Sequence, residues 1–141
     1  MKRIAVAVLF ALSLAARSSG QSGSVGEDPF ARFLFPPDRI MSHAQEIGLD
    51  DAQRNAIRNE VQRVQPKFID SQFELQAEME KMVKLLQDKP VEEAKVLAEV
   101  DRILALEKEV KKTQIGLLVR IKNVLTSAQQ AKLAELQKPI K

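Results

Sequence analysis

The sequence has no cysteine, tryptophan or tyrosine, and it has a single histidine. Without cysteine the chain can form no disulfide, offer no thiol nucleophile and hold no iron–sulfur cluster. It also lacks a glycine-rich phosphate loop and a nucleophile elbow. The acidic residues alternate with lysine and arginine, a pattern typical of solvated helix faces. We therefore predict that the protein is not an enzyme and needs no cofactor, with a divalent metal as the one option left open.

Glycine and proline are also scarce, at 5 and 6 of 141 residues, which favours an all-helical chain. The formal net charge is +3, but Lys2, Arg3 and Arg17 lie in a predicted leader and account for all of it. The basic run Lys108–Lys112 is interrupted by Glu109, so no basic stripe forms. The sequence therefore does not predict a nucleic-acid partner.

Residues 1–20 have the features of a secretory signal peptide. Two basic residues precede the apolar run Ile4–Leu14, and small residues follow it. The apolar run is too short to span a bilayer. This pattern predicts a periplasmic protein without a stable membrane span after cleavage. The alternative is an uncleaved anchor or a buried helix.

Residues 21–34 are predicted to form a flexible linker or arm, because glycine and serine dominate their first half. Phe30, Phe33 and Phe35 follow within six positions. Either these rings pack against the chain's own helices or those of a partner, or they form a mobile arm that competes for a binding surface. Residues 35–138 are predicted to form one helical domain.

A long helical run from Asp51 to Val124, broken at Asp88-Lys89-Pro90, dominates this domain. Apolar residues recur in steps of three and four on both sides of the break, which is the period of one helix face. The first arm has Ile57, Val61, Val64, Phe68, Leu75, Met79, Met82 and Leu86, and the second has Val96, Val100, Ile103, Val110, Leu117, Ile121 and Val124, with Glu107 and Gln114 in the skipped turns. We predict an antiparallel hairpin, with Pro90 suited to a first helical turn and Pro66 bending the first arm.

Shorter helices are expected at both ends of the hairpin. One is predicted over Pro37–Ile47 and stops at Gly48, and another follows the hairpin to about Gln137. Asp50 with Gln53, and Thr126 with Gln129, have the spacing of capping boxes, in which the cap side chain and the residue three positions on bond each other's backbone N–H.

These caps belong to two copies of one motif, Leu-Thr-x-x-Gln. The copies are Leu49-Asp50-Asp51-Ala52-Gln53 and Leu125-Thr126-Ser127-Ala128-Gln129, the first with aspartate in place of threonine. With the leader and the four helices, they make the chain resemble the Spy/CpxP superfamily of bacterial periplasmic proteins. The segment Leu34–Leu49 is similar to the first helix of metal-sensor-like members. The resemblance implies a bent, dimeric, cradle-shaped hairpin that acts as an ATP-independent chaperone or senses metal through several histidines.

His43 and Glu46 are the metal-ligand candidates, because residues three apart share a helix face. Glu60 or Met41 could add a third ligand. A tight transition-metal site usually needs more than one imidazole, and relatives that bind metal use several. The alternatives are therefore a surface or packing histidine, or a site completed across a dimer.

The apolar residues outnumber what two facing stripes can bury. We predict that the surplus forms a client-binding or homodimer surface. The candidates are Phe73, Met79, Met82, Leu104, Ile115 and Leu118.

The leading hypothesis is a periplasmic ATP-independent chaperone or stress-response adaptor that binds unfolding proteins on a concave helical surface. The alternatives are a heavy-metal sensor or resistance protein, and a purely structural coiled coil.

Overall fold

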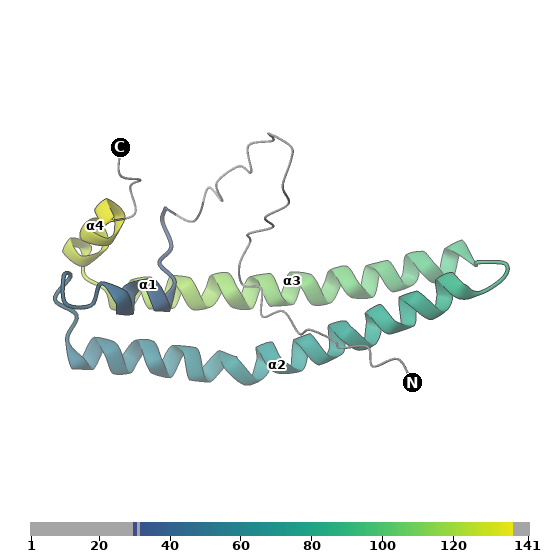
Figure 1. The fold of residues 1–141 in the computed structure, drawn as a ribbon, viewed down its shortest axis with the longest axis horizontal. Coiled ribbons are helices and arrows are strands. Elements are labelled where there is room, and N and C mark those ends of the chain that lie inside the picture. Colours follow the sequence, from purple (N-terminus) through teal and green to yellow (C-terminus); the bar gives the residue numbers. More distant parts are fainter. Residues whose placement is uncertain (1–29, 31, 137–141) are drawn as a thin grey trace, which may run out of the picture.

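The computed structural model describes residue 30 and residues 32–136, which form four helices and no strand (Figure 1). The helices are α1 (Pro37–Ser42), α2 (Asp51–Gln87), α3 (Glu93–Val124) and α4 (Ser127–Leu136). The prediction of an all-α fold built on a hairpin is confirmed. The predicted signal peptide, the first part of the arm and Pro139 lie outside the described residues.

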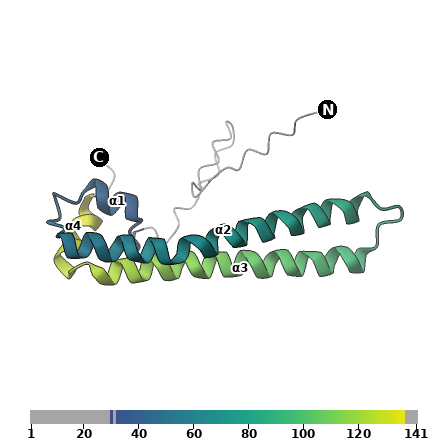
Figure 2. The same ribbon diagram turned by 90° about the horizontal axis from the view of Figure 1, so that it is seen from below.

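Helices α2 and α3 lie antiparallel along their length and make the main contact between helices. The connection spans residues 88–92, so Pro90 lies in the loop and not in the first turn of α3, where proline would have been tolerated. Helices α1 and α4 lie together at the opposite end of the hairpin (Figure 2). We call the end with α1 and α4 the proximal end and the loop end the distal end.

Helix α2 is continuous through Pro66 and bends near its middle (Figures 1 and 2). Proline has no N–H, so the carbonyl four residues earlier loses its helical partner and the helix axis can tilt there. The prediction of a bend without a break is confirmed.

The buried apolar core is concentrated at the proximal end. It consists of Phe35, Ile40, Ala44, Ile47, Leu49, Ile57, Val64, Leu117, Ile121, Leu125 and Leu133. Burial of these side chains fixes α1 and α4 onto the hairpin, since neither helix is long enough to be stable alone. Phe35 packs into this core, whereas Phe30 and Phe33 are exposed.

In the distal half, the predicted contact stripe is partly wrong. Met79 and Leu86 are exposed, and Glu78 and Leu85 are the partly buried residues instead. After Phe68 the stripe follows positions 71, 75, 78, 82 and 85, which are alternating steps of three and four. The predicted stripe took a step of four from Leu75 and again from Met82, where the contact face takes a step of three. It therefore left the contact face at Met79 and Leu86.

Helix α3 differs from the prediction in the same way. Glu107, assigned to a skipped turn of the stripe, is exposed. Leu106 is partly buried in its place, and two turns earlier Glu99 is buried against α2 beside Ile103. The distal contact face therefore contains acidic residues from both helices.

Helix α1 was predicted to reach Ile47 but ends at Ser42. The chain continues in tight turns, in which Ala44 N–H donates to the Met41 carbonyl and Leu49 N–H donates to the Ala44 carbonyl. These turns bury Ala44 and Ile47 as a helix would. The apolar spacing therefore could not distinguish the turns from a longer helix. Gly48 has φ 66°, a left-handed conformation that favours glycine.

Candidate functional site

The two capping boxes lie side by side and bond each other. Asp50 accepts a hydrogen bond from Gln53 N–H (2.7 Å), and Gln53 Oε1 accepts from Asp50 N–H (3.2 Å). Thr126 Oγ1 accepts from Gln129 N–H (3.2 Å), and Gln129 Oε1 accepts from Thr126 N–H (2.9 Å). These bonds satisfy N–H groups at the start of α2 and α4 that have no partner within the helix.

The two glutamines also form a reciprocal pair, which we call the glutamine clasp. Gln53 Nε2 donates to Gln129 Oε1 (2.7 Å), and Gln129 Nε2 donates to Gln53 Oε1 (2.9 Å). The remaining amide hydrogens reach the backbone carbonyls of Val124 (3.0 Å) and Gly48 (3.3 Å). The motif residues thus join the ends of α3, α4 and the turn before α2, which is a structural role.

His43 and Glu46 lie together at the proximal end. His43 Nδ1 is 2.7 Å from Glu46 Oε1, and both side chains are partly exposed. The proposed third ligands do not complete this pair: Glu60 bonds Arg120 and Arg63 on the hairpin, and Met41 is exposed. Within the described residues no group of three histidine or acidic side chains is placed to hold a metal ion.

Large apolar side chains are exposed along the distal half of the hairpin. They are Ile69, Phe73, Met79, Val83, Leu86, Val91, Leu97 and Leu104. Phe73 is the most exposed of them, at 69%. Three other surface candidates, Met82, Ile115 and Leu118, are partly buried and contribute less area.

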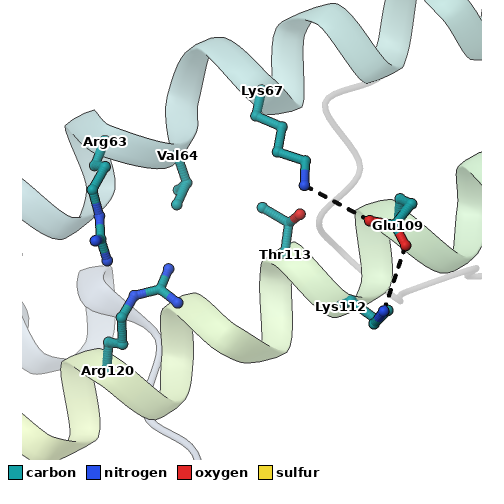
Figure 3. Close-up of a pocket in the computed structure, with 7 residues that line it drawn as sticks. All are labelled: Arg63, Val64, Lys67, Glu109, Lys112, Thr113 and Arg120. Carbon is teal, nitrogen blue, oxygen red and sulfur yellow. Dashed lines mark ion pairs between the residues drawn. The ribbon is translucent and has the colours of Figure 1, made fainter.

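A charged cleft of about 340 Å³ lies between α2 and α3, lined by Arg63, Val64, Lys67, Glu109, Lys112, Thr113 and Arg120 (Figure 3). Lys67 and Lys112 both approach Glu109, at 3.8 and 3.6 Å. Arg120 and Arg63 share Glu60 in the same way, and the hydrogen bond from Arg120 is the main reason that the pKa of Glu60 is lowered. Four cations share two carboxylates, which leaves the cleft electropositive.

Glu78 and Glu99 form a second charged feature, which our sequence interpretation missed. Glu99 is 1% exposed, and its Oε2 accepts a hydrogen bond from Arg102 Nη1 at 3.1 Å. Its Oε1 has no N–H or O–H partner in the described part of the chain. The available signal was the spacing, because both acids fall on the three-and-four steps of the contact face.

None of the helices in residues 32–136 is long and apolar enough to span a membrane. Comparison with curated proteins and with solved structures found no match in either case. The sequence model of one family, described as heavy-metal resistance, matches residues 3–132. This match confirms the predicted resemblance, and the chain belongs to the heavy-metal resistance family, a family of Spy/CpxP-like helical proteins.

Proposed function

We propose that the protein contributes to heavy-metal resistance in the periplasm by binding partly unfolded proteins on the exposed apolar surface of the distal hairpin. The observation that supports this proposal is the difference in apolar burial between the proximal and the distal end of the hairpin. The proximal end buries most of its apolar residues in a core, with Met41 and Val119 exposed, while the distal half exposes eight large apolar side chains. So many large apolar side chains exposed in one half of a monomer favour a binding partner there.

The chemistry of this surface suits varied clients. Met79 has a flexible side chain that adapts to partners of different shape, and Phe73 adds a large aromatic contact. The electropositive cleft at Arg63 and Arg120 lies at the distal edge of the proximal core, whose Val64 lines it, and it would attract acidic client segments before apolar contact forms. This activity needs no ATP, and we propose that a homodimer presents two such surfaces.

Replacing Phe73 by aspartate is expected to weaken client protection about tenfold, because a charge replaces the most exposed ring of the surface. The measurement is the protein concentration needed to halve the aggregation of an unfolding client, with sedimentation to record the oligomeric state. Gln72→Asp is the matched control, since it adds the same charge to the neighbouring exposed position. Equal loss in both variants, or no protection by the wild-type protein, would contradict the proposal.

Direct metal binding at His43 and Glu46 is a second candidate function, favoured by the close pairing of the two side chains and by the family. On the leading proposal, His43→Ala leaves the fold and the client protection unchanged, because one imidazole and one carboxylate make a weak site. The measurement is calorimetric titration with zinc, nickel and copper, with Ser42→Ala as the control. Stoichiometric metal uptake that His43→Ala abolishes would favour the sensing function, including a site shared across a dimer.

A further inference from the structure

The paired acids of the distal half occupy an unusual position for charged groups. Glu78 of α2 and Glu99 of α3 lie on the contact face between the helices, where neighbouring positions are apolar: Leu75 and Met82 on α2, and Val96 and Ile103 on α3. A buried carboxylate is costly unless each oxygen is hydrogen-bonded or the group takes up a proton. Glu99 Oε1 lacks a donor in the described structure, so the site is incomplete with both acids ionised.

The cations around the pair are already engaged. Lys81 of α2 bonds Glu78 Oε2 at 2.7 Å, and Arg102 of α3 bonds Glu99 Oε2 at 3.1 Å. Each cation lies three residues from its own acid on the same helix. They hold one oxygen of each carboxyl group, and a hydrogen bond between Glu78 and Glu99 would require a proton on one of them.

We propose that Glu78 and Glu99 form a proton-binding site that holds the distal halves of α2 and α3 together. When Glu99 is protonated, it donates to the Glu78 carboxylate and its own charge is removed from the interface. When that proton is lost, two like charges face each other across the contact, one of them buried. The distal helices then separate more readily, and the apolar residues of the contact face become accessible.

The direction of the pH dependence follows from the two pKa values. The hydrogen bond to Glu78, followed by burial, raises the pKa of Glu99 above its ordinary value of 4.5, and the same hydrogen bond lowers the pKa of Glu78. The stabilisation from Glu99 is therefore complete below pH 4.5 and is lost as the pH rises through its raised pKa. The stabilisation from Glu78 is present above pH 4.5 and is lost as the pH falls through its lowered pKa. The distal helices are therefore held together most strongly between the lowered pKa of Glu78 and the raised pKa of Glu99.

The distal half is well placed to respond to one proton. Within the described chain the buried apolar cluster lies at the proximal end, so few packed side chains oppose separation of the distal helices. Regions with little buried apolar contact open at low free-energy cost. The proposal concerns the hairpin itself and does not require that the exposed surface binds clients.

The test is backbone hydrogen exchange of the purified protein between pH 4 and 8, in the presence of a chelator. The rate for distal peptides of wild type is divided by that of Glu99→Gln at each pH, which cancels the intrinsic pH dependence of exchange. The amide introduced by this substitution carries no charge and can still donate to Glu78, so the variant represents the protonated site. We expect the ratio to be near one at low pH and to rise by up to about tenfold for each unit by which the pKa of Glu99 is raised.

Peptides from the proximal end should show no such change, and Glu107→Gln, an exposed acid on the same helix, should exchange like wild type at every pH. Glu78→Gln should weaken the pH dependence without removing it, because the amide relieves the repulsion while burial still raises the pKa of Glu99. A ratio of the wild-type to the Glu99→Gln exchange rate that stays constant across the pH range would overturn the proposal. So would distal closure at pH 8 when the chelator is replaced by a divalent cation, which would make the pair a metal site.

Discussion

Replacing Gln129 by leucine is expected to lower the free energy of unfolding by about 3 kcal/mol, although glutamine and leucine side chains are similar in size. Gln129 is buried, and its amide takes part in four hydrogen bonds, with Thr126 N–H, both amide atoms of Gln53 and the Gly48 carbonyl. Leucine removes all four and leaves several polar partners without a bond, each at a cost of about 1–3 kcal/mol. Water reaches some of these partners at the partly exposed edge, which limits the total.

Thr126→Ala is the comparison for this variant, because it removes only the cap hydrogen bond to Gln129 N–H and should cost about 1 kcal/mol. Urea denaturation with an unchanged m-value gives both differences. The double variant Gln53→Leu with Gln129→Leu should be less destabilised than the sum of the single variants, because each single change leaves the other glutamine unpaired. Strict additivity, or a Gln129→Leu cost no larger than that of Thr126→Ala, would show that the clasp does not join the helices.

The helices and their antiparallel order could be predicted from the sequence because the signals are local. Steps of three and four marked most of each contact face, and Asp88-Lys89-Pro90 marked the only break between them. The length of α1 could not be obtained in this way. Turns and a helix both bury Ala44 and Ile47, and the choice depends on how residues 43–49 pack against α4 and the hairpin.

The clasp and the acidic pair show why the candidate site was harder to predict. Each capping box can be identified from five residues, but the bond between Gln53 and Gln129 joins positions 76 apart in the sequence. The acidic residues as a group were assigned to solvated faces because they alternate with basic residues, as Glu78 does with Lys81 three positions away. The same spacing occurs on exposed helices, so only the packing of α2 against α3 reveals that Glu99 is buried.

Replacing Ile121 by alanine is expected to destabilise the protein by about 3–4 kcal/mol, the largest effect that we predict for a single apolar residue. Ile121 is 0% exposed and belongs to the cluster that contains Ile40 of α1, Ile57 of α2 and Leu133 of α4. Alanine removes three carbon atoms from this packed region, and the surrounding helices are held by the clasp and cannot close the cavity fully.

Ile69→Ala is the matched control, since it makes the same chemical change on α2 at a side chain that is 43% exposed. Its cost should stay below about 1 kcal/mol, because little apolar area leaves water on folding and alanine is the better helix former. Thermal and urea unfolding followed by circular dichroism measure both variants. Equal costs at the two positions would mean that Ile69 is buried in solution, as it would be in a dimer interface. A large difference would show that folding stability is concentrated at the proximal end, which leaves the distal apolar residues free to bind other proteins.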